Sequence, residues 1–371
     1  MRIGIDAGRV LHGDGGVASY TQRLVTALVE CATGCQIVLY DLDRGANLRQ
    51  TFETAFGELP DEIGIGSPPG DLSSLDLFHA PGFQMPPQGA PSHVFTLHDL
   101  TVLSHPGFHK LDNRVRALAS TAQALARGAT MLAVSEATRG EAVRLLAMSG
   151  EQLEVVPPIL DARFSPHDDG GRDSELLRRM GVFKPYALAV ASLEPRKNFS
   201  RLLEAWEILS EDLRQTHSLV LVVSTGWMQG AVRRRLGKMR RFGEVVLLEH
   251  LDAAQLARLY RNARALVFPS LAEGFGLPIA EAMACGAPVV TSNRSSMPEV
   301  AGEAAVLVDP EDSSEIANAV SLVLGDEDLR RDLRDRGFEN AAKYTAEAVV
   351  PRLVEMYRRT ADQSRIGLKY G

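Results

Sequence analysis

Short apolar runs alternate with segments of helical periodicity along the first part of the chain. The first run, Arg2–Asp6, is followed by a glycine-rich turn and a helical pattern from Val17 to Cys31. Further runs of strand length lie at Gln36–Tyr40, Leu75–His79, His93–His98, Met131–Ser135 and Leu153–Val156. Short runs rich in Val, Ile and Leu, separated by helices such as Asn113–Arg127, are typical of a parallel sheet covered on both faces. Residues 1–165 are therefore predicted to form a doubly wound α/β domain.

The same alternation starts again after a proline-containing and polar stretch, which predicts a linker at about 157–184. Strands are expected at Tyr186–Ser192, Ser218–Ser224, Val245–Leu248, Ala265–Pro269, Pro288–Ser292 and Ala305–Val308, with a helix at Phe199–Leu209. Residues 166–345 are thus predicted to form a second Rossmann-like domain. Open α/β sheets bind ligands at the carboxyl ends of their strands, so we expect the two domains to face each other across a cleft.

A long apolar-periodic segment, Ala346–Thr360, follows the second predicted sheet. We expect residues 346–371 to cross back and pack on the first domain. A helix that packs on the second domain is the alternative that the pattern leaves open.

Composition narrows the class of protein. The 371 residues are 45% hydrophobic and 23% charged, as in folded globular chains. No apolar run approaches the roughly 20 residues that cross a bilayer. The net charge of −7 argues against a general nucleic-acid binder. Asp6 argues against a signal peptide, and three cysteines without zinc spacing indicate a reducing cytoplasm.

The strongest chemical signal is the loop Ser192-Leu193-Glu194-Pro195-Arg196-Lys197-Asn198, directly after a predicted strand. Asn198 is suited to cap the helix that starts at Phe199. Arg196 and Lys197 then precede a helix N-terminus, which is itself positive. This arrangement favours an anion between them, such as a phosphate or diphosphate, over two side chains that point to solvent.

A second signal is the segment Glu273–Glu281, which follows the predicted strand Ala265–Pro269. Its glycines allow close approach of a ligand to the backbone, and Phe275, Gly276 and Leu277 would offer N–H donors. Glu273 lies in the loop and Glu281 is expected in the first helical turn. Carboxylates accept hydrogen bonds from the hydroxyl pairs of ribose or a hexose. Stabilisation of the helix dipole is the structural alternative for Glu281.

The first half carries weaker signals. Gly13-Asp14-Gly15-Gly16 links a strand to a helix but lacks the full dinucleotide spacing. Asp41 and Asp43 form a D-x-D pattern that can hold a divalent metal, although turn acids are the commoner explanation. His98 and Asp99 end a predicted strand, where the imidazole is placed for a polar contact with a bound group.

The basic run at 233–241, with Arg233, Arg234 and Arg235, is most simply a solvated helix face. A weak peripheral contact with anionic lipid is the alternative.

These motifs resemble those of glycosyltransferase family 4, a group of retaining GT-B enzymes. Glu194–Asn198 resembles the family's E-P-x-K-N loop, and Glu273–Glu281 resembles its E-x7-E motif. Ala284–Val290 and Pro298–Val300 continue the likeness, which covers most of 185–345. The linker departs from the family pattern at 156–161, and the closing helix departs at Tyr344-Thr345, but neither departure touches the donor motifs.

The resemblance implies a role for each matching position. Arg196 and Lys197 would neutralise the departing diphosphate, with Ser192 in the same donor-binding loop. Glu281 would bind the ribose hydroxyls. Glu273 and the Phe275–Leu277 backbone would hold the transferred sugar. From the first domain, His98 would contact that sugar, Gly15 and Gly16 would approach the diphosphate or the acceptor, and Asp99 is a weaker candidate for acceptor binding.

The resemblance also implies transfer with retention, by front-face attack and without a metal or other cofactor. The expected partners are a nucleotide-diphosphate sugar and a glycan, lipid-linked or small-molecule acceptor, in the cytoplasm or at the inner face of the membrane. The loop at 192–198 and Gly226-Trp227 favour GDP-mannose; UDP-glucose and UDP-N-acetylglucosamine are alternative donors. An NAD-dependent oxidoreductase and a non-catalytic nucleotide-sugar-binding protein are the competing hypotheses. The sequence does not define the acceptor, the linkage or the oligomeric state.

Overall fold

The computed structural model describes residues 1–12, 15–42, 52–53, 56, 63–66, 72–82, 84, 89–167, 173–224 and 230–370. The chain divides into two compact units. The first comprises Met1–Ile159 and Tyr344–Gly371, and the second comprises Leu160–Lys343. The predicted boundaries were 1–165, 166–345 and 346–371, so each observed boundary lies within a few residues of the expected one.

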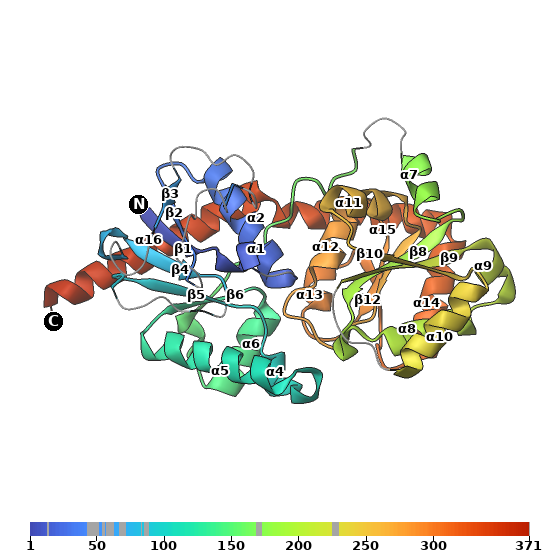
Figure 1. Cartoon of the computed structure of the whole chain (residues 1–371), viewed down its shortest axis with the longest axis horizontal. Coiled ribbons are helices and arrows are strands. Elements are labelled where there is room, and N and C mark those ends of the chain that lie inside the picture. The colour runs from blue at the N-terminus through green and yellow to red at the C-terminus, as the bar shows by residue number, and fades with distance from the viewer. Residues whose placement is uncertain are drawn as a thin grey trace. The chain divides into compact units, whose positions relative to one another are not determined.

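The first unit is built on a parallel seven-stranded sheet with the order β3-β2-β1-β4-β5-β6-β7 (Figure 1). Its strands are β1 (Arg2–Asp6), β2 (Gln36–Tyr40), β3 (Gly64–Ile65), β4 (Leu77–Ala80), β5 (His93–Leu97), β6 (Thr130–Ala133) and β7 (Leu153–Val155). The inner strands are almost wholly buried, which explains why they appear in the sequence as continuous apolar runs. The two-residue strand β3 was not predicted, because it is too short to give such a run.

Helices cover both faces of this sheet. They are α1 (Gly8–His12), α2 (Gly16–Cys31), α4 (Thr101–Ser104), α5 (Leu111–Ala126), α6 (Glu136–Leu146) and α16 (Ala346–Tyr370), with short 3-10 turns at Leu72–Ser74, Pro106–Phe108 and Gly150–Gln152. Figure 1 shows α2 and α16 on one side of the sheet and α5 and α6 on the other. In α16, Val349, Val350, Leu353 and Tyr357 are buried. The closing helix belongs to the first unit, and Tyr357 contacts His79 of β4, so the alternative that the pattern left open, packing on the second domain, is not what the structure shows.

The second unit repeats the design with a parallel six-stranded sheet of order β10-β9-β8-β11-β12-β13. Its strands are β8 (Tyr186–Ser192), β9 (Ser218–Ser224), β10 (Val245–Glu249), β11 (Ala265–Phe268), β12 (Val289–Ser292) and β13 (Ala305–Val308). In both sheets the strand order reverses beside the first strand, between β1 and β4 and between β8 and β11. Such reversal points are where doubly wound sheets bind their ligands.

The helices of the second unit also lie on two faces. They are α7 (Asp173–Arg179), α8 (Phe199–Ile208), α9 (Glu211–Thr216), α10 (Gly230–Arg241), α11 (Ala253–Asn262), α12 (Leu277–Ala284), α13 (Met297–Ala301), α14 (Ser313–Gly325) and α15 (Glu327–Ala341), with 3-10 turns at Pro195–Lys197 and Ala342–Tyr344. Helices α8, α10 and α14 share one hydrophobic cluster with the sheet, centred on the buried Trp206. Among the described residues, no helix is long and apolar enough to span a bilayer.

Candidate active site

Two loops meet at the reversal point of the second sheet. One follows β8 and contains the 3-10 turn Pro195–Lys197. The other follows β11 and runs from Pro269 to Gly276. The backbone N–H of Leu271 donates to the carbonyl of Arg196 at 2.8 Å, which joins the two loops directly. The two motifs that the sequence singled out are therefore neighbours at the carboxyl ends of β8 and β11, where the doubly wound topology places a ligand site.

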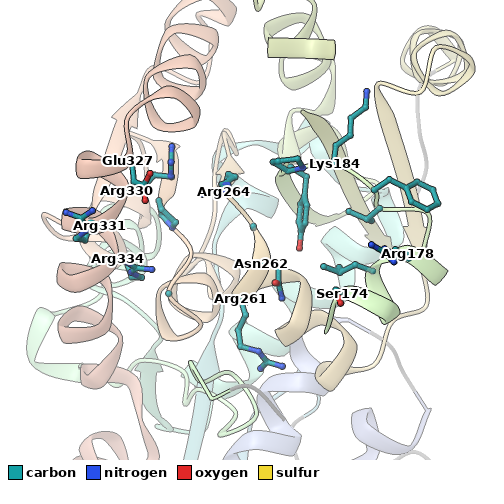
Figure 2. A pocket seen from close by; sticks show the side chains of 18 residues that line it. Ser174, Arg178, Lys184, Arg261, Asn262, Arg264, Glu327, Arg330, Arg331 and Arg334 are labelled. Atoms are coloured by element: carbon teal, nitrogen blue, oxygen red, sulfur yellow. The ribbon is translucent and has the colours of Figure 1, made fainter. Parts of the chain in front are cut away.

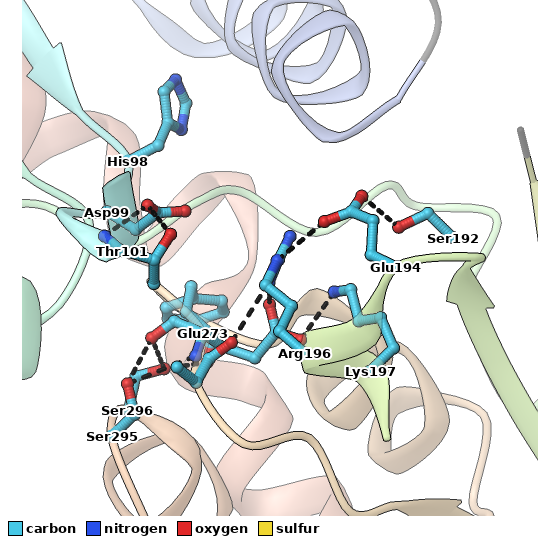
Figure 3. Close-up of polar contacts among 12 residues, drawn as sticks. His98, Asp99, Thr101, Ser192, Glu194, Arg196, Lys197, Glu273, Ser295 and Ser296 are labelled. Atoms are coloured by element: carbon cyan, nitrogen blue, oxygen red, sulfur yellow. Dashed lines mark hydrogen bonds and ion pairs between the residues drawn. The ribbon is translucent and has the colours of Figure 1, made fainter. Parts of the chain in front are cut away.

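Glu273 is held between both cations of the first loop (Figure 3). Its Oε1 accepts a hydrogen bond from Nζ of Lys197 at 2.6 Å, and its Oε2 pairs with Nη1 of Arg196. The side chain of Glu273 is 7% exposed, and those of Arg196 and Lys197 are 13% and 10% exposed. The three groups thus form a nearly buried charge cluster.

The electrostatics of the cluster keep Glu273 ionised at neutral pH. Burial raises the pKa of Glu273, but the positive charges of Arg196 and Lys197 outweigh it and hold this pKa at about 2. Burial lowers the pKa of Lys197 and the charge of Glu273 opposes that effect. A carboxylate that is fixed in this way keeps two cations in place at the end of the sheet.

Glu194 completes the first loop. Its Oε2 accepts from Nε of Arg196 at 2.8 Å, and its Oε1 accepts from the hydroxyl of Ser192 at 2.6 Å. Arg196 also donates to the carbonyl of Ala272 at 3.2 Å. The sequence predicts an anion beside Arg196 and Lys197, supplied by a ligand. The structure provides one from the chain itself, and this role of Glu273 was not expected.

The prediction for Asn198 was wrong in its mechanism. Asn198 does precede α8, but its side chain makes no cap hydrogen bond and its φ is 61°. Its Nδ2 instead donates to the carbonyls of Pro269, at 2.9 Å, and Pro310, at 2.6 Å. A cap was expected because Asn is common at helix starts, whereas its actual partners are distant in sequence and left no local signal.

The backbone around Glu273 is fixed by two serines that the sequence argument missed. The hydroxyl of Ser295 donates to the carbonyl of Glu273 at 2.6 Å, and that of Ser296 donates to the carbonyl of Phe275 at 2.7 Å. Gly276 then starts α12 with a φ of 104°, a conformation that suits glycine. The N–H of Leu277, the first residue of α12, has no partner inside the helix and can serve as a donor to a ligand, whereas Pro278 has no N–H and that of Ile279 donates to the carbonyl of Gly276 at 2.9 Å.

Glu281 lies in the second turn of α12, because the helix begins at Leu277. Its expected position in the first turn is therefore wrong, and with it the argument that the helix N-terminus explains an acid here. The carboxylate is 5% exposed, and its Oε2 accepts from the hydroxyl of Tyr260 at 3.1 Å. Glu281 is thus a positioned, nearly buried carboxylate in the same unit as Glu273.

In the first unit, Gly15 and Gly16 form the entry to α2. Gly15 has a φ of 99°, which side chains rarely adopt. A Cβ atom added at Gly15 or Gly16 would meet no described atom within 4 Å. The backbone is therefore open to approach at this point. Gly13 and Asp14 lie outside the described residues.

His98 follows β5 and is oriented by a backbone carbonyl. Its Nε2 lies 2.6 Å from the carbonyl oxygen of Pro81, which can only accept, so Nε2 carries the proton. Burial lowers the pKa of His98, although the Pro81 bond and Asp99 act in the opposite direction. A neutral His98 presents Nδ1 as an acceptor. Asp99 accepts from the N–H of Thr101 at 2.9 Å and so fixes the start of α4.

A buried polar chain behind β5 was not predicted. Nδ1 of His79 lies 2.6 Å from the hydroxyl of Tyr357, and its Nε2 lies 2.7 Å from Oγ1 of Thr96. Burial lowers the pKa of His79 to about 3, so this imidazole is neutral. Tyr20 packs edge-on against His98, with ring centroids 4.8 Å apart, and its hydroxyl lies 3.4 Å from Oγ1 of Thr96. The chain thus links the closing helix to the surroundings of His98.

The D-x-D pattern at Asp41 and Asp43 and the segment Gly226-Trp227 lie only partly within the described residues. Asp43 and the segment Gly226-Trp227 lie outside the described residues, and Asp41 is buried at the end of β2. In the part of the chain that the structure describes, no group of three or more His, Cys, Asp or Glu residues is arranged to hold a metal ion.

The fold is that of a two-domain α/β glycosyltransferase of the GT-B class. A sequence profile described as "Glycosyl transferases group 1" matches residues 181–340. O-antigen chain mannosyltransferase B of Escherichia coli is 31% identical over 283 residues, which cover 76% of this chain and 74% of that protein. The serotype-specific mannosyltransferase WbdA of Escherichia coli is 28% identical over 244 residues, or 64% of this chain, and the chain spans only 30% of that longer protein.

Among solved structures, Anabaena Alr3699/HepE in complex with UDP-glucose superposes with a TM-score of 0.73 at 18% sequence identity, over 97% of this chain and 100% of that chain. This likeness shows the fold. The chain belongs to the group 1 glycosyl transferases, and it is a hexosyltransferase.

Proposed function

We propose that this hexosyltransferase moves mannose from GDP-mannose to a hydroxyl group of a glycan, lipid-linked or small-molecule acceptor. The observation that carries the proposal is the likeness to O-antigen chain mannosyltransferase B, which extends over 76% of the chain. UDP-glucose and UDP-N-acetylglucosamine are the alternative donors, and UDP-glucose is the sugar nucleotide named for the HepE structure. The family assignment favours these donors over the oxidoreductase hypothesis.

Arg196 and Lys197 are proposed to hold the donor diphosphate. Glycosyl transfer leaves negative charge on the departing phosphate, so cations fixed before the reaction lower its barrier. The structure supports this role because both cations are anchored by Glu273 and need little reorganisation. Lys197 spends one of its three ammonium hydrogens on Glu273, and among the described residues it has no other hydrogen-bond acceptor. Two hydrogens are thus left for phosphate oxygens.

Glu273 is proposed to serve the transferred sugar as well. An ionised carboxylate offers about four acceptor sites on its two oxygens. The contacts with Arg196 and Lys197 use one site on each oxygen. Hydroxyl groups of the hexose would take remaining sites, together with the backbone donors of Phe275, Gly276 and Leu277. Glu273 would then align the sugar with the same cations that receive the leaving group.

The remaining roles follow the same chemistry. Glu281 is proposed to accept from the ribose hydroxyls. His98 would accept from a sugar hydroxyl through Nδ1, because its Nε2 is bound to Pro81. Gly15 and Gly16 would admit the diphosphate or the acceptor close to the backbone, and Asp99 is the weaker acceptor-binding candidate. Retention of configuration and independence from metal are part of the proposal.

We further propose that the protein works in the cytoplasm, with weak contact at the inner face of the membrane through α10. Val232, Leu236 and Met239 of this helix are buried, whereas Arg233 and Arg234 are exposed. The aromatic ring of Phe242, next to the helix, is 70% exposed. An exposed basic face with an adjacent aromatic ring is suited to anionic lipid headgroups.

A donor panel tests the proposed function. The purified chain is incubated separately with GDP-mannose, UDP-glucose and UDP-N-acetylglucosamine, with a mannose-terminated glycan as acceptor, and both nucleotide release and the elongated glycan are measured. We expect transfer with GDP-mannose and loss of transfer in Lys197→Ala. Transfer from a UDP-sugar alone would replace the donor assignment. Absence of transfer and of donor hydrolysis with every sugar nucleotide, despite binding, would favour a non-catalytic protein.

A further inference from the structure

The second unit contains a cavity at the edge of its sheet opposite the candidate active site. The cavity has a volume of about 530 Å³ and is lined by Tyr186, Arg264 and Pro288, which lie at the amino ends of β8, β11 and β12. Arg196, Lys197 and Glu273 do not line it. Its volume falls in the range of small-molecule sites, about 300–1,000 Å³. It is therefore separate from the donor motifs, and its assignment does not rest on the proposed function.

The wall of this cavity is strongly cationic. Seven basic side chains line it, against one carboxylate, Glu327: Arg178, Lys184, Arg261, Arg264, Arg330, Arg331 and Arg334. They come from three places in the chain. Figure 2 shows Arg330, Arg331 and Arg334 of α15 on one side, Arg178 and Lys184 on the other, and Arg264 between them. We refer to this site as the basic pocket.

Some of these cations already have partners. Arg331 pairs with Asp328 at 3.1 Å, and Nε of Arg261 lies 3.5 Å from Asp173. Arg330 donates to the carbonyls of Val323 and Leu324 at 2.8 and 2.7 Å. The other four, Arg178, Lys184, Arg264 and Arg334, have no ion pair with any residue that the structure describes.

The unpaired charges influence their neighbours. Burial is the main cause that lowers the pKa of Arg330, and the charge of Arg264 lowers it further, whereas the charges of Glu327 and Asp326 act in the opposite direction. Burial also lowers the pKa of His217, and the charges of Arg264 and Arg330 again add to the effect. Like charges that act on one another at short range cost free energy where nearby carboxylates offset them only in part. A bound polyanion would remove that cost.

We propose that the basic pocket binds a ligand that carries two or more phosphate groups. Six of the seven cations are arginines, whose planar guanidinium groups bind phosphate oxygens in pairs. Because they lie on separate elements, they can contact separate phosphates of one ligand. The hydroxyl of Ser174 lies in the same wall and adds a neutral donor. An extended nucleic acid fits less well, because the site is a cavity and the whole chain has a net charge of −7.

The exposed aromatic ring of Phe183 borders the basic pocket and is relevant to which kind of molecule carries the phosphates. Phe183 is 77% exposed and contributes to the lining beside Lys184. A flat, solvent-facing ring can stack on a nucleobase. It can also contact the apolar part of a lipid. The shared chemistry is the phosphate cluster, and the source is either a soluble nucleoside polyphosphate or an anionic phospholipid headgroup.

The first test is calorimetric titration of inorganic tripolyphosphate into three full-length proteins: the wild type, the pocket variant Arg264→Gln/Arg334→Gln, and the control Arg233→Gln/Arg234→Gln. The control removes the same charge from exposed positions of α10 that do not line the pocket. The donor motifs are intact in all three, so any binding there is common to them. We expect affinity to fall about tenfold or more only in the pocket variant, since two charge-assisted contacts are lost. Equal affinity in wild type and pocket variant would overturn the proposal, as would an equal loss in the control.

Thermal unfolding gives a second measurement on the same proteins. Without ligand, the pocket variant should unfold at or above the wild-type temperature, because the repulsion between Arg264 and Arg330 is removed. Tripolyphosphate should raise the unfolding temperature of the wild type and the control more than that of the pocket variant. The same rise in all three proteins would contradict the assignment.

The two sources are separated with ATP and with vesicles that contain cardiolipin, a lipid whose headgroup carries two phosphates, using phosphatidylcholine vesicles as the reference. Weaker ATP binding in the pocket variant, with unchanged vesicle binding, supports a soluble ligand. Weaker vesicle binding in the pocket variant supports a lipid headgroup. If vesicle binding falls only in the α10 control and ATP binds equally to all three proteins, the basic pocket has no phosphate ligand of either kind.

Discussion

Nζ of Lys197 and Oε1 of Glu273 lie 2.6 Å apart, although 76 residues separate them in the sequence. Arg196 binds the other oxygen of the same carboxylate. Removal of Lys197 therefore leaves Glu273 paired with Arg196, whereas removal of Glu273 leaves two nearly buried cations without their shared anion. This asymmetry distinguishes the consequences of substitutions at the two positions.

Lys197→Ala should reduce turnover by about 10²-fold or more, because one fixed cation is lost from the leaving group. Glu273→Ala should show a similar loss of turnover together with reduced stability. Nucleotide release under saturating donor measures the first effect and thermal unfolding the second. Lys238→Ala, on the exposed face of α10, is the matched control. Wild-type turnover in Lys197→Ala would remove this residue from the active site.

The pairing of Glu273 predicts a specific dependence of stability on pH. Its pKa is about 2 in the folded protein, below the ordinary 4.5. The ionised carboxylate therefore stabilises the fold fully above pH 4.5, and this contribution disappears as the pH falls toward 2. We expect the free energy of unfolding of the wild type to exceed that of Glu273→Gln by about 3 kcal/mol at pH 7.

That advantage should be much smaller at pH 3. Both tryptophans of the sequence, Trp206 and Trp227, fall within the sequence range 160–343, so urea unfolding followed by tryptophan fluorescence reports on this part of the chain. An equal difference between wild type and Glu273→Gln at pH 7 and pH 3 would show that the carboxylate is not held ionised by its partners.

Two substitutions at Asn198 separate its backbone role from its side-chain role. Both Asn198→Gly and Asn198→Ala lose the bonds to the carbonyls of Pro269 and Pro310, at a cost of about 1–3 kcal/mol. Alanine should cost about 1 kcal/mol more than glycine, because the φ of 61° is strained for a residue with a Cβ. Urea unfolding measures both. Equal stability of the two variants would contradict the strain argument.

Tyr357→Phe should destabilise the first unit by about 1–3 kcal/mol, because Nδ1 of the buried His79 loses its partner. The double variant His79→Leu/Tyr357→Phe removes both polar groups and should lose less than the sum of the two single variants. Hydrogen exchange of the β4 and β5 amides measures the effect within the first unit. Additive losses would indicate that the two groups do not interact.

Transferase activity should be unchanged by EDTA, since fixed cations take the place of a metal at the leaving group. The measurement compares nucleotide release before and after chelation. Abolition by EDTA and restoration by Mg²⁺ would instead identify Asp41 and Asp43 as metal ligands.

Much of the fold could be predicted because a buried parallel strand is recognisable from a short apolar segment of the sequence alone. Arg2–Asp6, Tyr186–Ser192 and Ser218–Ser224 have the predicted bounds, since in each a short apolar stretch is bounded by polar or charged residues. The two donor motifs were also visible, because each occupies one short segment after a strand.

The features that the sequence did not predict depend on contacts between segments that are distant in the chain. The link between Glu273 and the two cations, and the bridge from Asn198 to Pro310, join loops that only the folded sheet brings together. The basic pocket is a clear case. Its basic residues lie in three separate segments and form no run in the sequence, as Arg178, Arg264 and Arg334 show. The adjacent Arg233 and Arg234 do form a run and are therefore recognisable in the sequence, although they are exposed on a helix surface.

The division of the chain also dictates an order of events on the ribosome. Leu160–Lys343 is continuous, so the second unit can finish its core while translation proceeds. The first unit begins earlier but includes Tyr344 onward, and the face of its sheet that α16 shares with α2 stays partly uncovered until that segment emerges. The half that is synthesised first is therefore the half that matures last, and in the interval its exposed strands are the part of the nascent chain most in need of a chaperone.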